Sequence, residues 1–478
     1  MRAHLRASVH ALAACAAALL LAGCSTARPW INAPLASDAQ WHAAIPRPAA
    51  QASAPEAAHP IIAAVTLSGG GARAAAFGLG VLQELKATRF ELEGRRTTLL
   101  DEVGLVSGVS GGSVLAAYYA AFGDEVFARF ERDFLLVNFQ SGLVRDILSP
   151  RNLYRLSSPW WGRSNALAQQ LDPLFRGMTF GELRVRRPRP SLLVTATDLT
   201  TGAPFEFTPE QFALICSDLD SVPLSFAVSA SSSVPVLLSP VTLRNYAGTC
   251  PQAVPAQDAP ERNLSARLLH RIAESYRDAQ ERPSIHLVDG GLADNLGVRG
   301  LVDHTIAAGS LSESFGALPD GSVRSIVLVS VNSERDLGER IDASDRVPGI
   351  GQVMNALLFG AGSRYTAETT AMVDDIARRL REEVRATRGR AGSPFAADAE
   401  LHVINVSLRD VRDPVLREPL LRVPTAFEIL PTQVRELQAA GRQALREAPE
   451  FQRLRRTLGA DLLEALSPLN SDRTATDP

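Results

Sequence analysis

Short runs of apolar residues recur along the chain, and longer segments with a helical spacing of apolar residues lie between them. The short runs predict strands at residues 61–68, 104–107, 191–198, 285–289, 325–332 and 401–408. Several runs are apolar throughout rather than alternating, which is typical of strands covered by helices on both faces. The longer segments predict helices at residues 72–86, 111–122 and 296–307. This alternation predicts an α/β fold with a mainly parallel central sheet flanked by helices.

Aromatic residues are concentrated between residues 124 and 183, where they interrupt this alternation. Two interpretations stay open: these side chains form a cap over a site, or they pack in the ordinary core. Trp160 and Trp161 are candidates for lipid contact, because tryptophan prefers a boundary between apolar and aqueous surroundings. The residues concerned are Phe127, Phe130, Phe134, Phe139, Tyr154, Trp160, Trp161 and Phe175.

The first residues have the pattern of a targeting segment. Arg2 and Arg6 precede an apolar stretch at residues 11–22, which is too short to span a bilayer. The stretch leads into Leu-Ala-Gly-Cys at residues 21–24, which resembles the lipobox of bacterial lipoproteins. The resemblance implies that residues 1–23 are a lipoprotein signal peptide and that acylated Cys24 tethers the mature protein to a membrane. The alternative is a plain secretory signal in which Cys24 is incidental.

The residue after Cys24 is Ser25 rather than an acid, which is similar to lipoproteins sorted to the outer membrane. We therefore expect a lipid-anchored protein of the bacterial cell envelope, at the outer membrane. Residues 24–60 are rich in Ala, Pro and Ser, which predicts a flexible tether. We expect a catalytic core at residues 61–310, further strands and helices that complete or extend the fold at 311–465, and a disordered tail at 466–478.

Charge and composition exclude some function classes. The chain has 49 basic and 52 acidic residues and no block of arginines set apart from acids, so we expect no nucleic-acid partner. The cysteines and histidines lack metal-ligand spacing, so we expect no metal site. Cys216 and Cys250 remain once Cys15 leaves with the signal and Cys24 carries lipid. In an oxidising compartment they form either a disulfide or two free buried thiols.

Residues 108–112 read Gly-Val-Ser-Gly-Gly and fit the pattern Gly-x-Ser-x-Gly, with a predicted strand before them and a predicted helix after them. Gly108, Gly111 and Gly112 allow a tight turn that presents the Ser110 hydroxyl at the start of the helix. Amides at a helix N-terminus stabilise developing negative charge. The pattern therefore predicts that Ser110 is a nucleophile on a strand-turn-helix elbow.

Three consecutive glycines, Gly69, Gly70 and Gly71, stand between a predicted strand and a predicted helix. Without side chains, their amides can approach an anion closely. A nucleotide-phosphate loop is disfavoured, because the segment has neither Gly-x-Gly-x-x-Gly nor a Lys-Ser/Thr ending. The segment therefore predicts an oxyanion hole that serves Ser110.

Asp289 ends the predicted strand at residues 285–289, and Gly290 and Gly291 follow it. A carboxylate at a strand end is well placed for catalysis in a parallel sheet, so Asp289 could take the proton from Ser110 as the base. The alternative is that Asp289 caps the following turn or helix, although Asp294 is the better candidate for a cap.

A serine hydrolase triad would need a histidine. His304 falls within a predicted helix and His402 within a predicted strand, and neither stands in a loop at a strand end. His286 lies only three residues before Asp289. The residues therefore favour a serine–aspartate pair.

Four blocks follow one another in the chain: SGGGAR at residues 68–73, GVSGG at 108–112, AVSASSSVPVLLSPV at 227–241 and VDGG at 288–291. Together they resemble the patatin-like phospholipase family over about residues 61–305. The resemblance implies a three-layer patatin-like fold, a dyad of Ser110 and Asp289, no cofactor, and a helix in the third block that ends at Pro235. The implied oxyanion hole consists of the amides of Gly69, Gly70, Gly71, Ala72 and Arg73.

The glycine block departs from the family pattern at Ser68, where Asp is usual, and at Ala74, where Gly is usual. The resemblance implies hydrolysis of lipid acyl esters through an acyl-serine. Because the expected lipid anchor holds the protein at a membrane surface, the leading substrate is a phospholipid or lysophospholipid. Two rival hypotheses remain: an α/β-hydrolase esterase with a histidine triad, and a non-catalytic envelope lipoprotein that binds acyl chains or a partner.

Overall fold

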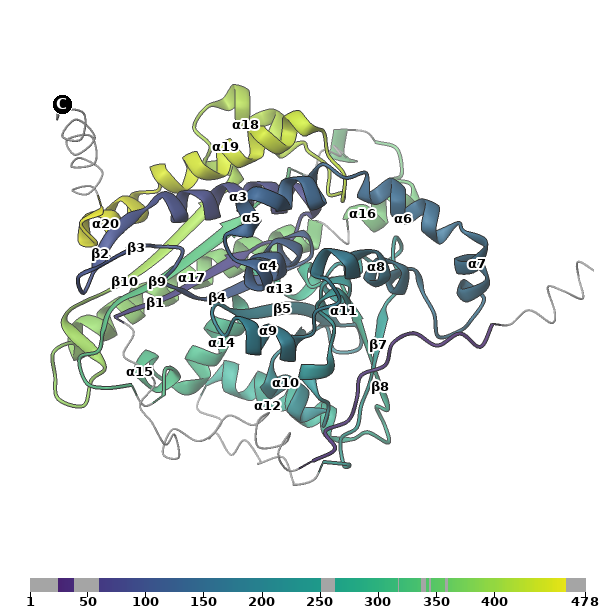
Figure 1. The fold of residues 1–478 in the computed structure, drawn as a ribbon, viewed down its shortest axis with the longest axis horizontal. Coiled ribbons are helices and arrows are strands. Elements are labelled where there is room, and N and C mark those ends of the chain that lie inside the picture. The colour runs from purple at the N-terminus through teal and green to yellow at the C-terminus, as the bar shows by residue number, and fades with distance from the viewer. Residues whose placement is uncertain are drawn as a thin grey trace, which may run out of the picture.

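The computed structural model describes residues 25–37, 60–250, 263–316, 318–336, 341–343, 345–356 and 360–460. The predicted signal peptide, Cys24 and the predicted tail at 466–478 lie outside these residues. Within the described chain, an eight-stranded sheet forms the centre of the molecule, and a separate hairpin lies at its side (Figure 1). The sheet strands are β1 (Ile61–Leu67), β4 (Val103–Gly108), β5 (Ser191–Asp198), β6 (Pro204–Glu206), β7 (Val241–Arg244), β8 (Ser284–Val288), β9 (Val323–Asn332) and β10 (Phe395–Ser407). The hairpin strands are β2 (Arg89–Leu92) and β3 (Arg95–Thr98).

The strand order is β10-β9-β1-β4-β5-β8-β7, with β6 paired to β5. The strands from β10 to β5 run parallel. β8 runs antiparallel to both β5 and β7. The expected mainly parallel sheet is therefore confirmed, but Asp289 follows a reversed strand. β8 pairs with β5 at two positions, Thr197 with Val288 and Asp198 with Leu287, so these two antiparallel strands overlap at their carboxyl ends.

Helices cover both faces of the sheet. One apolar cluster joins α3, α4 and α19 to β1, β4 and β9 on one face, and a second joins α14 and α17 to the other. In the described part of the chain, no helix is long and apolar enough to cross a membrane. The helices are α3 (Gly71–Ala87), α4 (Gly111–Phe122), α5 (Glu125–Phe130), α6 (Phe139–Ile147), α7 (Pro150–Leu156), α8 (Arg163–Leu171), α9 (Phe180–Arg186), α10 (Pro209–Leu214), α11 (Leu224–Ser231), α12 (Leu264–Arg277), α13 (Gly291–Asp294), α14 (Arg299–Ala308), α15 (Leu311–Ser314), α16 (Ile350–Asn355), α17 (Ala361–Thr387), α18 (Pro414–Leu421), α19 (Pro431–Glu447) and α20 (Pro449–Thr457).

Two predicted helices have different bounds in the structure. The helix expected at residues 296–307 begins at Arg299, because the Asp294 carboxylate accepts the amides of residues 296, 297 and 299 and caps the turn before it. The helix expected to end at Pro235 ends at Ser231, where the chain turns toward Asp289. The six predicted strands all form, within about two residues of their expected bounds at most ends.

The region after residue 310 completes the same sheet. β9 pairs along the whole of β1, with Val65 opposite Val329, and β10 adds beside β9. α19 lies against α3 at close range: a Cβ on Gly80 would stand 2.1 Å from the carbonyl oxygen of Gln438, and one on Gly441 would stand 2.2 Å from that of Phe77. These two glycines allow the helix backbones to touch. The middle of α3 is therefore braced by the C-terminal region.

Most of the aromatic residues between 124 and 183 pack in the core. Phe130, Phe134 and Phe175 are fully buried, and Trp161 is 5% exposed. The alternative of ordinary core packing therefore holds for these residues. Tyr154 and Trp160 differ, since they are 60% and 46% exposed.

The segment at residues 25–37 contradicts the prediction of a flexible tether for that part of the chain. Asn32 is buried and exchanges side-chain hydrogen bonds with the backbone of Arg244 at 2.9 and 2.7 Å. The Leu35 amide donates to the carbonyl of Cys216 at 2.9 Å, and the Trp30 ring lies 4.5 Å from that of Phe226. An Ala- and Pro-rich segment without periodicity is held here by backbone pairing and single anchoring side chains, which an apolar pattern does not reveal.

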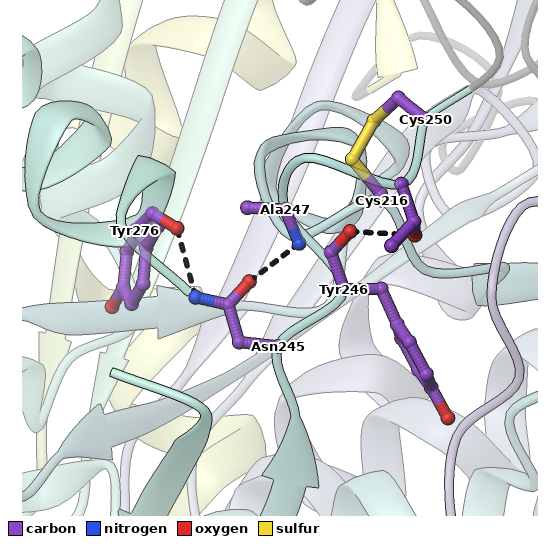
Figure 2. Close-up of a disulfide and its surroundings, with 7 residues drawn as sticks. Cys216, Asn245, Tyr246, Ala247, Cys250 and Tyr276 are labelled. Atoms are coloured by element: carbon purple, nitrogen blue, oxygen red, sulfur yellow. Dashed lines mark hydrogen bonds between the residues drawn. A yellow bond between two sulfur atoms is a disulfide. The ribbon is translucent and has the colours of Figure 1, made fainter. Parts of the chain in front are cut away.

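Cys216 and Cys250 form a disulfide, with their Cα atoms 5.3 Å apart (Figure 2). The bond joins the loop after α10 to the loop after β7. The Asn245 side chain supports the second loop by donating to the Tyr276 carbonyl at 2.8 Å and accepting from the Ala247 amide at 2.9 Å. Because Cys216 also accepts from Leu35, the disulfide lies beneath the N-terminal segment.

Candidate active site

Ser110 stands on the elbow between β4 and α4. Its backbone angles, φ 50° and ψ −124°, lie outside the regions that L-residues ordinarily adopt. Such strained residues persist only where their surroundings hold them, and they gather at functional sites. The turn places Ser110 immediately before the first residue of α4, as the sequence predicts.

The glycines of the elbow are required by close backbone packing. A Cβ on Gly108 would lie 2.6 Å from the Cα of Ser113, and one on Gly112 would lie 2.4 Å from the Leu67 carbonyl oxygen. A Cβ on Gly111 would lie 2.1 Å from the carbonyl oxygen of Gly71. The elbow and the glycine loop are therefore in direct contact, which brings Ser110 beside the predicted oxyanion donors.

Asp289 is fixed by its backbone. Its amide donates to the carbonyl of Ser233 at 2.9 Å, and its own carbonyl accepts the Thr197 hydroxyl at 2.8 Å. The following Gly290 lies so close to β5 that a Cβ there would stand 2.1 Å from the carbonyl oxygen of Thr195. These contacts direct the Asp289 side chain toward Ser110.

The buried carboxylate of Asp289 faces the hydroxyl of Ser110. Burial raises the pKa of Asp289 to about 6, while hydrogen bonds from the Gly291 amide and the Ser110 hydroxyl lower it. Oδ1 accepts the Gly291 amide at 2.8 Å, whereas Oδ2 has no hydrogen-bond partner of normal geometry among the described residues. The serine contact is therefore loose, as catalytic hydrogen bonds often are without substrate. A carboxylate with this pKa is ionised at neutral pH and basic enough to accept a proton.

The glycine loop offers fewer free amides than the sequence predicts. The Gly69 amide donates to the carbonyl of Asn295 at 3.0 Å, and the Ala72 amide donates to that of Ala426 at 2.7 Å. These two residues are therefore not oxyanion donors in this arrangement. Gly70 and Gly71, with φ of 140° and 62°, stand at the N-cap and first position of α3, where amides have no acceptor within the helix.

The Arg73 amide stays a predicted oxyanion donor, and its side chain adds a contact that the sequence did not predict. The guanidinium is buried and donates to the carbonyls of Ser333 at 2.8 Å and Val423 at 2.7 Å. Burial, together with the nearby charge of Arg335, lowers the pKa of Arg73 to about 9. Arg73 thus ties the glycine loop to the C-terminal region.

A cavity of about 90 Å³ brings these groups together. Sequence reasoning missed its residues beyond position 305, where the only available signal was a polar run directly after the strand at 325–332. Glu334, which accepts a hydrogen bond from Ser363, has its pKa raised by burial. The lining residues are Gly69, Gly70, Arg73, Ser110, Val234, Pro235, Asp289, Gly291, Leu292, Asn295, Glu334, Arg335, Gly362, Ser363 and Thr425.

No histidine is among these described lining residues. His304 lies 3.8 Å from the carboxylate of Glu206, and His402 is buried against Glu450 at 2.8 Å. His286 pairs with Thr242 on β7. The three histidines are engaged elsewhere, so the geometry favours the serine–aspartate pair over a histidine triad.

The described residues include no group of three or more His, Cys, Asp or Glu side chains arranged to hold a metal ion. The chemistry that the cavity offers comes from a strained serine, a buried carboxylate, and two amides at a helix N-terminus. That set fits attack on an ester carbonyl and stabilisation of the resulting oxyanion.

The sequence pattern of the patatin-like phospholipase family matches residues 65–302. No curated protein matches the chain. Among solved structures, human GIVD cytosolic phospholipase A2 aligns with a TM-score of 0.42 and 12% identity over 88% of this chain and 62% of its own. VipD from Legionella pneumophila aligns with a TM-score of 0.32 and 13% identity over 84% of this chain and 68% of its own. The chain thus spans about 62% of the length of the human phospholipase.

Proposed function

The chain carries a patatin-like phospholipase domain at residues 65–302, the domain of a family of lipid acyl hydrolases, and on this premise we propose that it is a membrane-anchored serine acyl hydrolase. Ser110 is the nucleophile and Asp289 is the base. The observation that supports this proposal is the buried carboxylate of Asp289 facing the hydroxyl of Ser110 in one cavity. The proposed substrate is a phospholipid or lysophospholipid.

The proposed reaction has two halves. Asp289 takes the hydroxyl proton as Ser110 Oγ attacks the ester carbonyl carbon, and the amides of Gly70 and Gly71 hold the oxyanion. The tetrahedral intermediate collapses, the alcohol leaves with the proton from Asp289, and the acyl group stays on Ser110. Asp289 then takes a proton from water, which attacks the acyl-serine and releases the fatty acid while Ser110 regains its proton.

Electrostatic stabilisation should rival the nucleophile in importance. Loss of one oxyanion donor typically lowers the rate by about 10²–10³, or roughly 3–4 kcal/mol. Gly71 packs directly against the C-terminal region: a Cβ there would stand 2.3 Å from the Ala426 carbonyl oxygen, and the next amide, that of Ala72, donates to the same oxygen. The region outside the family match is therefore part of the proposed catalytic unit.

The proposed location follows from the first residues of the chain. Acylation of Cys24 would place the enzyme at the bacterial outer membrane, where substrate is reached within the lipid surface. Radiolabelled palmitate should enter the wild-type protein and should not enter a Cys24→Ser variant. Palmitate incorporation into both proteins would leave the anchor proposal without support.

The deciding test of activity is mass-spectrometric profiling of membrane lipids incubated with wild type, Ser110→Ala and Asp289→Asn. Wild type should release fatty acid and accumulate the deacylated lipid, while both variants should release none above background. A fluorophosphonate serine reagent should label wild type and fail to label Ser110→Ala. If wild type neither reacts with the reagent nor cleaves any acyl ester, a non-catalytic lipoprotein that binds acyl chains or a partner replaces this proposal.

A further inference from the structure

Exposed apolar side chains gather on the two short helices α6 and α7 and on the chain next to them. Their exposed fractions run from 42% for Val137 to 62% for Leu148. Soluble monomers seldom expose apolar side chains in such groups without a binding role. We call this surface the α6–α7 face; it consists of Leu136, Val137, Val144, Leu148, Leu153, Tyr154 and Trp160.

The charge of the same segment is one-sided. Between positions 136 and 163 the sequence has one acidic residue, Asp146, and four basic residues, Arg145, Arg151, Arg155 and Arg163. The whole chain, by contrast, has a net charge of −3. Surfaces that lie in the headgroup region of anionic bilayers typically combine apolar side chains with flanking arginines.

The start of the described chain lies on this face. The Ser25 amide donates to the Ser157 hydroxyl at 3.1 Å, and the Ser158 hydroxyl donates to the Ala27 carbonyl at 2.7 Å. The Arg28 guanidinium stands 3.3 Å above the ring of Trp160. Figure 1 shows this purple segment running from α7 along the side of the molecule.

Ser25 directly follows Cys24, the residue proposed to carry lipid. Ser25 itself is bonded to Ser157, directly after the end of α7, so the described chain begins on this face. Because residues 25–37 are fixed on the domain rather than free, the anchor restricts which face of the protein can meet the bilayer.

The face also continues toward the cavity. Val234 and Pro235 line the cavity with Ser110, and the next two residues, Val236 and Leu237, are 64% and 67% exposed. Arg163, which begins α8 directly after the Trp160 segment, donates to the Val236 carbonyl at 2.8 Å. One surface therefore runs from the N-terminal segment to the edge of the proposed active site.

We propose that the α6–α7 face, together with Val236 and Leu237, docks on an anionic lipid bilayer and sets the orientation in which the cavity meets the membrane. The apolar side chains enter the headgroup boundary, the arginines meet anionic headgroups, and the fixed N-terminal segment holds the anchor on the same side. This inference rests on the proposed lipid hydrolase function, because it names the surface from which the substrate enters.

The test measures binding of the purified full chain to vesicles. A Leu153→Asp/Tyr154→Asp variant should bind vesicles that contain phosphatidylglycerol at least about tenfold more weakly than wild type, because the docking face loses two exposed apolar side chains that would enter the bilayer. Val415→Asp, at an exposed valine on α18, is the matched control and should bind like wild type. Brominated lipid should quench tryptophan fluorescence in wild type and quench it less in Trp160→Phe.

An Arg145→Gln/Arg151→Gln variant should bind the anionic vesicles about 30-fold more weakly and bind pure phosphatidylcholine vesicles like wild type, because each arginine near an anionic surface contributes roughly 1 kcal/mol. Wild-type binding by Leu153→Asp/Tyr154→Asp would overturn the docking proposal. If the Leu153→Asp/Tyr154→Asp variant changed its oligomeric state while its vesicle binding stayed at the wild-type level, the α6–α7 face would instead be a protein–protein interface.

A soluble short-chain ester separates this inference from the proposed function. The face variants should hydrolyse the soluble ester at the wild-type rate and hydrolyse vesicle phospholipid more slowly. If wild type hydrolyses neither substrate, the proposed function fails while the vesicle binding data still decide the docking surface. Equal hydrolysis of vesicle phospholipid by wild type and the face variants would refute the docking surface and leave the hydrolase intact.

Discussion

The backbone amide of Ser110 donates to the hydroxyl of Ser231 at 2.8 Å. The same hydroxyl donates to the Thr195 carbonyl at 2.6 Å, and the Ser231 carbonyl accepts the Gly290 amide at 3.1 Å. Ser231 therefore connects the nucleophile elbow, the middle of β5 and the turn after Asp289. This single residue sets the spacing of two groups that come from opposite directions in the sheet.

Replacing Ser231 with alanine should lower kcat by about 10-fold to 100-fold with little change in KM, because small displacements of reacting groups are costly to the rate. The unpaired amide and carbonyl should also lower the free energy of unfolding by about 1–3 kcal/mol. Steady-state kinetics on a soluble ester and urea unfolding measure the two effects.

The neighbouring Ser232 supplies a matched control. Its hydroxyl is equally buried but has no hydrogen-bond partner among the described residues. Ser232→Ala should therefore keep wild-type kcat and equal or slightly exceed wild-type stability. Equal losses of kcat in Ser231→Ala and Ser232→Ala would show that the Ser110–Ser231 contact does not position the nucleophile.

Activity should depend on pH through the ionisation of Asp289. Burial raises the pKa of this carboxyl from 3.8 to about 6, and the ionised form is the base. The value of kcat/KM should therefore be flat above pH 7 and fall about tenfold for each pH unit below 6. A profile that stays flat down to pH 5 would contradict the assignment of Asp289 as the base.

The ionised, buried carboxylate of Asp289 should also lower the free energy of unfolding at neutral pH. A carboxyl whose folded pKa is raised stabilises the fold only while protonated, and this stability is lost as pH rises from about 4 through 6. A shift of about two units corresponds to roughly 3 kcal/mol. Asp289→Asn should therefore be more stable than wild type at pH 8, by up to about that amount, while urea unfolding at pH 4 should show a much smaller difference. An equal difference at both pH values would exclude ionisation as its cause.

The parts of the site that were predictable from sequence depend on local geometry. Ser110 lies in a tight turn, with a φ of 50°, and the glycine after it packs against Gly71 too closely for a side chain. A short sequence pattern shows this requirement for glycine. The apolar runs of β1 and β9 were predictable for a related reason, since burial on both faces selects apolar residues at every position.

The parts that were not predictable depend on contacts between distant segments. The amides of Gly69 and Ala72 donate to the carbonyls of Asn295 and Ala426, which are more than 200 residues away in the sequence. A local sequence pattern does not show which distant carbonyl will accept a backbone amide. The same holds for Asn32, whose side chain is bonded to the backbone of Arg244. The direction of β8 could not be predicted either, because an apolar strand has the same sequence pattern whether it runs parallel or antiparallel.

Removing the disulfide should destabilise the protein without changing its chemistry. Cys216 and Cys250 are 34 positions apart, which corresponds to about 4 kcal/mol in the loop-entropy account of disulfide stabilisation. A Cys216→Ala/Cys250→Ala variant should lose about that amount in urea unfolding and keep its kcat on a soluble ester. Reduction with dithiothreitol should lower the stability of wild type and leave the variant unchanged; no effect of reductant on wild type would mean that the bond does not form.

The contact between the elbow and the glycine loop is the most stringent requirement of the site. A Cβ on Gly111 would lie 2.1 Å from the carbonyl oxygen of Gly71, so Gly111→Ala must push apart the segment that carries the nucleophile and the segment that carries the oxyanion donors. We expect a loss of more than about 100-fold in kcat/KM and a drop in unfolding free energy of about 3 kcal/mol or more. Gly351→Ala is the control, because a Cβ on this helical glycine meets nothing within 4 Å, and it should be neutral or stabilising by up to about 1 kcal/mol. Circular dichroism and soluble-ester kinetics measure both variants, and wild-type activity in Gly111→Ala would show that the oxyanion is held somewhere other than at the start of α3.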